Sequence, residues 1–560
     1  MRPVVNLQVS PDGRKNWLLD KEQKDESSRI QIGRLTLDHG QVSFDDPRRK
    51  THLAVDVSTQ DVVNNGSTQT GVVFAAKGRY QGMPLKARGT GGSVLALNDQ
   101  TLPYPLNVDA SIGHTALQAD GTITGLTTLA RVDMQLALRG DSLAELYPLL
   151  GIALPETHAY HTKGHVLHHA KTWRYEKFSG QIGASDLAGT LQVDTDAKRP
   201  YLQGEVVSQL LDITDLGPVI GAQQTMPASA KLRSEPAAPT ATGANAAPSQ
   251  VLPDIPFRTE RWRSVDADVK LRAKTIRRAK ALPLEDFTAH LKMQDAVLTL
   301  DPLNFGVADG TLASTVVLDG QRDPIQARAK IHIRKILLKK LFPTIKLTKT
   351  SIGEINGEVD LEGNGNSVGR MLGTSNGKFA LVVAGGEISK LMMEMAGLHL
   401  WDMLKLKITG DQVIPIRCGV AEFNVKSGVM AADVFILDTT ITTLNMSGTI
   451  SLRDEKLDLE LDPKTKKTSV IALRGPIYIH GTFSDPRAEI DTRRVAARSL
   501  GAVALGVINP FLAILPLVET GPGMDSDCGR LIHDALQPAP GGTYKNAPAP
   551  TPTPTPQPNL

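Results

Sequence analysis

The sequence is poor in the residues that mark several common protein classes. Only 2 of its 560 residues are cysteine and 4% are aromatic, which argues against a disulfide-rich scaffold. Charge of one sign is also lacking, because 62 Lys and Arg stand against 59 Asp and Glu, a net charge of +3. This balance argues against a protein that binds nucleic acid by neutralising many phosphates.

Long hydrophobic runs are scarce as well. The best one, 500–518, is uncharged but is interrupted by Asn509, Pro510 and Pro516, whereas a bilayer span needs about 20 apolar residues. Two interpretations stay open for it: a transmembrane helix, or a broken pair of buried helices on the end of a sheet. The first residues lack the basic segment, apolar run and cleavage site of a secretory signal peptide.

Motifs for catalysis are missing from the sequence. It has no glycine loop for phosphate, no nucleophile elbow and no paired cysteines for zinc, so we expect no enzyme activity, no cofactor and no metal site. One histidine cluster could ligate a metal if it were helical: His158, His161, His165, His168 and His169. Gly164 favours a strand, in which His165 and His169 face one way and His168 the other. We therefore predict polar turn and strand surface here.

Alternation of apolar and polar residues is the dominant pattern. It is clearest in two regions, Leu106 to Ile112 with Val132 to Leu138, and Leu444 to Leu452 with Leu457 to Leu461 after a polar turn at 453–456. Strands with one wet and one dry face belong to antiparallel sheets. With 49 Gly and 35 Pro, the pattern predicts a mainly β fold: an elongated, curved antiparallel sheet groove of repeated strand units, with short helices and a helical C-terminal cap.

Length and composition predict at least two folded units. We divide the chain into a β-rich region at 1–222, an Ala/Pro-rich linker at 223–256, a second β-rich domain with terminal helices at 257–537, and a disordered Pro-rich tail at 538–560. The pattern Leu143-Ala-Glu-Leu-Tyr-Pro148 recurs at 338–343 and, more weakly, at 213–218, which favours stacked repeats. Short helices are expected near 141–149, 334–343, 387–406 and 495–518.

Two further clusters leave alternatives open. The basic residues Arg334, Lys335, Lys339, Lys340, Lys346 and Lys349 fit a site for anionic headgroups or nucleic acid, or the solvated face of an ordinary helix. The methionines Met392, Met393, Met395 and Met403 around Trp401 fit a lipid-contacting plug or the filling of an irregular core.

Five segments, taken in order, carry a resemblance to a known family. They are Pro283 to Leu291, Leu298 to Gly306, Pro415 to Phe423, Gly475 to Phe483, and Asp525 to Arg530. The chain resembles the AsmA family, with 257–533 similar to its C-terminal part. The resemblance implies a protein of the Gram-negative envelope that lies in the periplasm and is anchored in the inner membrane by an N-terminal helix. Since that anchor is missing here, we interpret the start as lying inside a longer gene product.

The resemblance also implies a role in outer-membrane biogenesis, with lipid transport in some members. We therefore expect a non-enzymatic protein that transfers or shields phospholipid, or another membrane lipid, along an apolar β-groove, with no nucleic acid partner. The candidate lining residues are Leu444, Met446, Ile450, Leu457, Leu459 and Leu461. The rival is a structural or interaction module with a closed β core that assists outer-membrane protein assembly by regulating protein targeting to the membrane.

The two cysteines, Cys418 and Cys528, both lie within segments that carry the resemblance. In an oxidising periplasm they could form one disulfide that pins the terminal helices against the sheet. They could equally be two separate buried thiols that behave as small apolar side chains. Both interpretations stay open, because the sequence does not place their Cα atoms.

Overall fold

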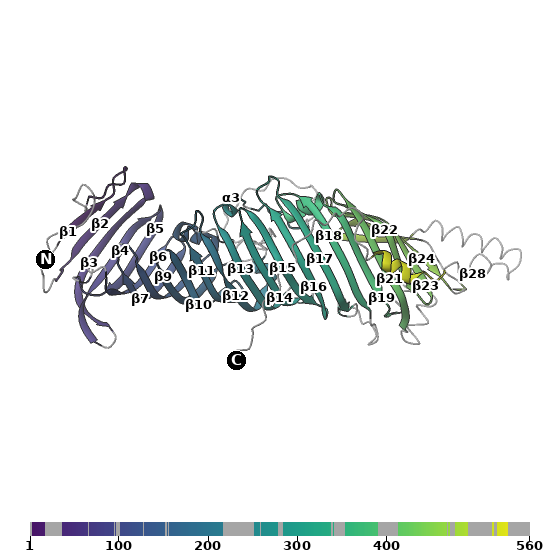
Figure 1. The fold of residues 1–560 in the computed structure, drawn as a ribbon, viewed down its shortest axis with the longest axis horizontal. Helices are drawn as coiled ribbons and strands as arrows, with labels where there is room; N and C mark the ends of the chain where they lie inside the picture. The colour runs from purple at the N-terminus through teal and green to yellow at the C-terminus, as the bar shows by residue number, and fades with distance from the viewer. Residues whose placement is uncertain are drawn as a thin grey trace, which may run out of the picture.

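The computed structural model is a long ribbon of strands that lie side by side, with β1 near one end and β23 near the other (Figure 1). It describes residues 3–16, 36–64, 67–94, 96, 101–126, 128–151, 154, 156–216, 251–257, 259–277, 284–337, 340, 353–389, 413–466, 469–470, 476–490, 518–519 and 524–535. Most of these residues are in strands, so the predicted mainly β fold is confirmed.

The first twelve strands form a meander. β1 pairs in parallel with β2, and from β2 to β12 each strand pairs antiparallel with the next one in sequence. Their bounds are β1 Val4–Gln8, β2 Gly40–Asp46, β3 Thr51–Asn64, β4 Ser67–Tyr80, β5 Met83–Gly91, β6 Pro103–Ile112, β7 Thr115–Thr124, β8 Arg131–Gly140, β9 Tyr160–His169, β10 Thr172–Ile182, β11 Ser185–Asp194 and β12 Tyr201–Asp212.

The later strands continue the meander. Antiparallel pairing runs from β13 to β19, then through β21 to β24, β26 and β27, while β20 pairs with β21. Their bounds are β13 Asp266–Arg277, β14 Leu284–Gln294, β15 Val297–Val307, β16 Gly310–Asp319, β17 Gln326–Leu337, β18 Glu354–Asn364, β19 Asn376–Ala384, β20 Glu387–Ser389, β21 Val413–Lys426, β22 Val429–Thr439, β23 Thr442–Ser451, β24 Lys456–Thr465, β26 Ile477–Thr482 and β27 Asp485–Ile490. Separately, β25 Ser469–Val470 pairs with β28 Val518–Glu519.

The sheet continues across the predicted linker. β12 and β13, which flank it, pair in parallel from Tyr201 opposite Asp266 to Asp212 opposite Arg277. The 26 strands other than β25 and β28 therefore form one sheet. Among the described strands β1 and β27 are not paired with each other, so the sheet is open.

The last residues of the predicted linker, 251–256, pack against the sheet. The backbone N–H groups of Val251 and Leu252 donate to the Glu455 carboxylate at 2.7 and 2.9 Å. Asp254 accepts a hydrogen bond from the Ser367 hydroxyl at 2.5 Å. Since Ser367 follows β18 and Glu455 lies between β23 and β24, this part of the predicted Ala/Pro-rich linker lies across strand ends.

The described helices are short. They are η1 Pro47–Arg49, η3 Leu143–Leu146, α1 Tyr147–Leu150, α2 Ile213–Leu216, α3 Thr259–Trp262, α5 Val368–Gly373 and α9 Cys528–Ala535. The helix predicted near 141–149 is confirmed by η3 and α1, and the pattern at 213–218 gives α2.

Two other predicted helices begin as strands. The prediction over 334–343 is wrong at its start, because β17 continues to Leu337 by pairing with β18, with an irregularity between Ile333 and Ile336. The prediction over 387–406 is wrong at its start, where β20 pairs with β21. The rest of 387–406 and the run 495–517 lie outside the described residues, and 518–519 is in β28.

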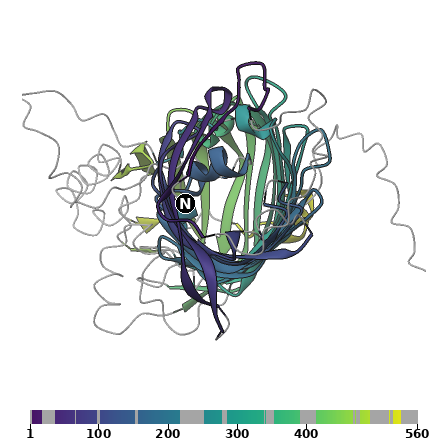
Figure 2. The same cartoon turned by 90° about the vertical axis from the view of Figure 1, so that its left-hand side faces the viewer.

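Glycines on one face allow the sheet to bend. Gly121 in β7 has φ +154 and Gly448 in β23 has φ +117. A Cβ atom on Gly121 would lie 2.2 Å from the Asp133 carbonyl oxygen, and one on Gly448 would lie 2.2 Å from that of Asp458. Only glycine allows the neighbouring strand to approach so closely, which is a known way to curve a sheet. The strands accordingly curl around the long axis of the molecule (Figure 2).

Candidate functional site

An apolar face runs along the sheet because apolar residues alternate within each strand and the register aligns them between strands. In β6, Val108 lies opposite Ala119 of β7, which in turn lies opposite Leu136 of β8. Leu106 and Leu138 lie on the same face, two residues away along their strands. One apolar surface therefore crosses these three strands without a break.

The same face continues through the middle of the sheet. Leu291 of β14 lies opposite Leu300 of β15, and Leu300 lies opposite Val316 of β16. These three side chains, like Leu271 in β13 and Ile331 in β17, are half-buried. A packed core between two sheets would bury them fully, and the described strands include no second large sheet to cover them. Val316 packs against the cluster that contains Met371 of α5 and Trp262 of α3, so the middle of the face is covered in part by these short helices and is otherwise partly open.

The six lining residues predicted from the sequence share this face in β23 and β24. The register sets Met446 opposite Leu461, Ile450 opposite Leu457, and Gly448 opposite Leu459, with Leu444 opposite Pro463. Leu444 and Leu459 are buried, whereas Met446, Ile450, Leu457 and Leu461 are half-buried. The structure therefore brings the six residues together on one surface, and their contact with lipid stays a prediction.

The opposite face of the sheet carries charged side chains. Between β17 and β18 they form three cross-strand ion pairs: Arg328 with Glu362 at 3.5 Å, Lys330 with Asp360 at 3.4 Å, and Arg334 with Glu358 at 3.0 Å. All six side chains are substantially exposed, so each pair contributes little to stability. Together these charged side chains make this face of the sheet hydrophilic.

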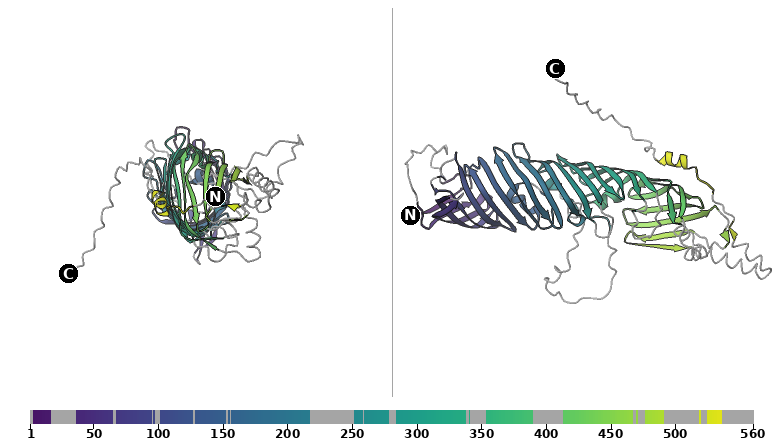
Figure 3. Two further views of the ribbon diagram at one scale, coloured as in Figure 1. Left: turned by 90° about the vertical axis from the view of Figure 1, so that its right-hand side faces the viewer. Right: turned by 90° about the horizontal axis from the view of Figure 1, so that it is seen from below.

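Two helices show which face is concave. The segment 143–150 packs on the apolar face through Leu146, which clusters with Tyr160 and Ile182, and a short blue helix lies inside the curl in Figure 2. Helix α9 packs on the other face, where Ala535 clusters with Val382, and it lies outside the sheet (Figures 1 and 3). The apolar face is therefore the inner wall of the curl.

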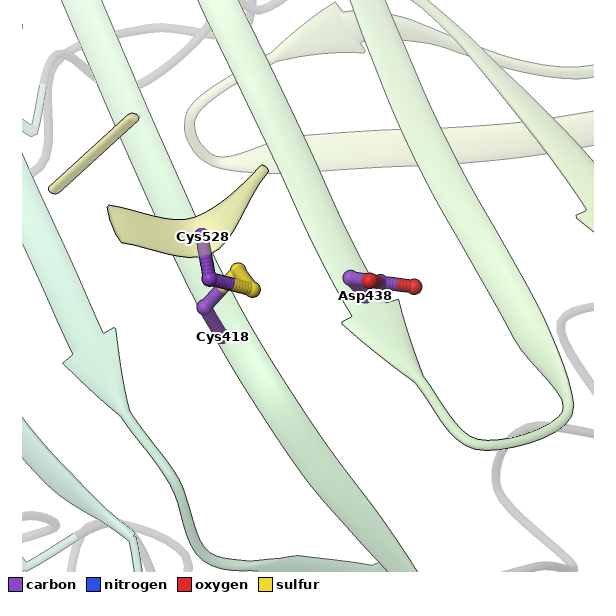
Figure 4. A group of neighbouring side chains, drawn as sticks. All are labelled: Cys418, Asp438 and Cys528. Carbon is purple, nitrogen blue, oxygen red and sulfur yellow. A yellow bond between two sulfur atoms is a disulfide. The ribbon is translucent and has the colours of Figure 1, made fainter. Parts of the chain in front are cut away.

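The outer helix α9 is joined covalently to the sheet. A disulfide links Cys418 of β21 to Cys528 at the start of α9, with 5.8 Å between the Cα atoms, as Figure 4 shows. Cys418 is fully buried. Behind the disulfide, Leu531 and Ile532 of α9 pack against the cluster that contains Val420. We call residues 524–535 the C-terminal clamp.

A buried carboxylate holds the start of the clamp. Asp438, at the end of β22, is fully buried and accepts hydrogen bonds from the backbone N–H of Ser526 at 3.0 Å and from Arg417 Nη1 at 3.1 Å. Its other oxygen contacts Lys466 Nζ and lies 3.1 Å from the Thr443 hydroxyl. These contacts satisfy both oxygens of the carboxylate, as a buried charge requires.

Asp525 completes the charge network from the clamp side. It lies 2.7 Å from Lys466 Nζ and 2.5 Å from Arg417 Nη1. The hydrogen bond from Lys466, with help from Arg417, lowers the pKa of the Asp525 carboxyl below its ordinary 3.8. Asp438 and Asp525 therefore each contact both Arg417 and Lys466. Sequence analysis missed this network, although Arg417 and Asp525 both lie within segments that carry the family resemblance.

The histidine cluster is dispersed over separate partners. His158 lies 2.7 Å from the buried Asp215 of α2, and His165 lies 2.7 Å from Asp133. His168 is buried and stacks on Trp173, with 4.0 Å between the ring centres. His165, His168 and His169 lie in the strand β9, so the helical arrangement that would gather metal ligands does not form.

The other clusters from the sequence are placed only in part. Arg334 pairs with Glu358 and Lys340 with Asp309, while Lys339, Lys346, Lys349, the four methionines 392–403 and Trp401 lie outside the described residues. The group Cys418, Asp438 and Cys528 is compact enough for a metal ion. Its sulfurs are bonded to each other, however, and its carboxylate already faces two cations.

A hollow of about 600 Å³ lies over β6 to β10. It is lined by 13 residues: Asn107, Val108, Asp109, Gln118, Ala119, Asp120, Gln135, Leu136, Ala137, Lys163, Gly164, Lys177 and Ser179. These include neither a histidine nor a cysteine, so this hollow offers no nucleophile with an adjacent imidazole base.

None of the helices in the described part of the chain has the length and apolar character that crossing a bilayer requires.

A model of the AsmA family matches residues 2–435. The chain is also 33% identical over 559 residues to the AsmA family protein YhjG of Escherichia coli (strain K12), and the match covers 95% of this chain and 81% of that protein. No solved structure matches the chain. With more than half of its length matched by the family model, the chain belongs to the AsmA family.

Proposed function

We propose that the chain shields or transfers the acyl chains of phospholipid along the concave face of its sheet, in the cell envelope between the inner and outer membranes, without catalysing a reaction. The observation that carries this proposal is the in-register continuity of the apolar face, which crosses from β6 to β8 and again from β14 to β16 and extends to β24. Membership of the AsmA family supports the envelope location.

The energetic need for such a surface is large. Each methylene kept from water contributes about 0.8 kcal/mol, so a two-chain lipid with roughly 30 methylenes would lose about 25 kcal/mol on entering water. An inner wall with half-buried leucine, valine and isoleucine side chains offers acyl chains a continuous apolar contact. This contact would lower the free-energy barrier to lipid transfer along the whole length of the wall, and no single binding pocket would be needed.

The proposed partner is recognised by its chains and not by its headgroup. The inner-face positions of β14 to β16 are apolar where Leu291, Leu300 and Val316 lie, whereas charged pairs occupy the outer face of the neighbouring strands. An apolar wall binds acyl chains by removing them from water, but it offers no polar contact that would distinguish one headgroup from another. We therefore expect phospholipids of several headgroups to bind.

The decisive experiment is transfer of a fluorescent phospholipid between vesicles, with lipid extraction and mass spectrometry of the purified protein. The variant Leu300→Asp/Val316→Asp places two carboxylates on the inner face at directly opposite positions. Its matched control, Thr299→Asp/Val317→Asp, places the same pair on the same two strands one position away, on the outer face.

The proposal expects co-purified phospholipid and a transfer rate that falls in the inner-face variant but not in the outer-face control. Like charges placed opposite each other destabilise both variants, but the outer-face pair lies beside Lys292 and Arg328, whereas the inner-face pair lies among apolar side chains. The melting temperature of each variant is therefore measured first, and transfer is compared between folded proteins only. Protein without bound lipid, or equal transfer by the two variants, would favour the rival function, a structural module that assists outer-membrane protein assembly.

A further inference from the structure

A helical segment near β8 and β9 lies on the apolar face, within the curl of the sheet, as Met371 of α5 and Trp262 of α3 do farther along it. We call η3 and α1 together, residues 143–150, the inner helix. Its residue Leu146 is 4% exposed and clusters with Tyr160 and Ile182, while Leu138 and Leu187 of the sheet pack against the same cluster. One side of the inner helix is therefore part of the inner wall.

Hydrogen bonds cap the inner helix at both ends. The Leu143 backbone N–H donates to the Thr157 hydroxyl at 3.0 Å, and the Thr157 N–H donates to the Ser142 hydroxyl at 3.0 Å. At the other end Gly151 has φ +69, and its N–H donates to the Tyr147 carbonyl at 2.8 Å. Capping of this kind fixes where the helix begins and ends, so its exposed side chains are held in defined positions.

Two large apolar side chains project from the inner helix away from the cluster. Tyr147 is 40% exposed and Leu150 is 50% exposed. They are three residues apart, which places them next to each other on the helix surface. Because the inner helix lies on the inner wall, this pair adds exposed apolar surface beside the wall.

We propose that Tyr147 and Leu150 form a contact point at which the inner helix narrows the apolar path and touches the acyl chains that pass along it. This inference rests on the proposed function, because the occupant is the acyl chain of a phospholipid. The choice of occupant follows from continuity: Leu146, on the buried side of the same helix, joins the cluster that contains Leu138, and Leu138 belongs to the apolar face.

The test is photocrosslinking in the full chain, with a photoreactive amino acid placed at one position at a time. The probe is phosphatidylethanolamine with a tagged acyl chain, in vesicles of phosphatidylethanolamine and phosphatidylglycerol. The test positions are Tyr147 and Leu150. The control on the same helix is the exposed Glu145, and Leu300 reports on the middle of the inner wall, where it is half-buried.

We expect lipid crosslinks from the photoreactive residue at positions 147, 150 and 300. We expect none from the control position, Glu145. Crosslinks at Leu300 alone would overturn the role of the inner helix and leave the proposed function standing. No crosslink at any of the four positions would overturn both.

A second variant tests the consequence for transfer. Tyr147→Ser/Leu150→Ser removes two exposed apolar side chains and leaves Leu146 in place, so the fold should be retained. Each methylene contact that is lost corresponds to an approximately fourfold change in affinity. Since the pair would stabilise acyl chains part-way along the path, we expect the transfer rate to fall by about that factor. Glu145→Gln is the control and should transfer at the normal rate. Equal rates in the two variants would contradict the inference.

Discussion

Asp438 is the residue whose loss should most weaken the C-terminal clamp. Asparagine would keep its shape but remove the charge that faces Arg417 and Lys466. Removing one partner of a buried ion pair costs about 3–5 kcal/mol, because it leaves the other charge uncompensated. The Lys466 side chain is only 9% exposed, whereas that of Arg417 is 34% exposed and partly hydrated. Since Asp525 still lies 2.7 Å from Lys466, we expect Asp438→Asn to destabilise clamp docking by about 3 kcal/mol, the lower end of that range.

Hydrogen exchange of peptides that cover 524–535 measures this opening directly, because the disulfide keeps the helix tethered while the clamp loosens. Asp458→Asn is the control, since its side chain is 78% exposed and lies 3.2 Å from His480, away from the clamp. Hydrogen exchange in the clamp of this variant should match that of the unchanged protein. Asp438→Asn/Lys466→Met should recover part of the loss, because no buried charge is then left unpaired. Unchanged exchange in Asp438→Asn, or a purely additive loss in the double variant, would refute the reasoning.

Three further outcomes are expected. Replacing Cys418 and Cys528 by alanine opens a loop of 110 residues and should lower the free energy of unfolding of this region by about 5 kcal/mol; an unchanged urea midpoint would contradict this. The hydrogen bond from its lysine partner lowers the pKa of Asp525 below 3.8, so its contribution is present above that value and is lost as the pH falls through the lower, folded value. The clamp, still tethered by its disulfide, should therefore be cleaved faster by an acid protease as the pH falls, and Asp525→Asn should remove this pH step. Finally, Gly121→Ala should lower the melting temperature more than Gly82→Ala, because both have positive φ but only Gly121 lacks room for a Cβ atom; equal losses would argue against the close approach as the reason for glycine.

The strands could be predicted because their pattern is local. Alternation at 106–112 and 132–138 marks β6 and β8 within a few residues of their bounds, and the polar turn at 453–456 separates β23 from β24. In each case a single strand, taken alone, shows which of its residues share a face. The shared face of Leu444 and Leu461 followed from the same rule, since a hairpin register continues it from strand to strand.

Features that depend on distant pairing could not be predicted in this way. The apolar and basic residues at 331–337 also fit a helix, and only pairing with β18 makes them a strand. The parallel contact of β12 with β13 joins segments on either side of a composition that indicates a linker. The bonds from Val251 and Leu252 to Glu455 join residues about 200 apart in sequence, and no local pattern carries that information.

Two of the five segments that carry the family resemblance contribute residues to the clamp, whereas the residues of the proposed lipid path share only their apolar character. Cys418 and Arg417 lie in one family-like segment and Asp525 and Cys528 in another. The two cysteines bond to each other, and Arg417 contacts both Asp438 and Asp525, in a geometry that other residue types do not reproduce well. The inner wall requires only that an apolar side chain recur at every second position, which leucine, valine, isoleucine or methionine satisfies equally. A surface that recognises acyl chains by area alone therefore tolerates exchange among these residues, whereas the clamp does not. If the proposed function is correct, single substitutions among apolar residues of the wall should change transfer little, and substitutions in the clamp should act through stability.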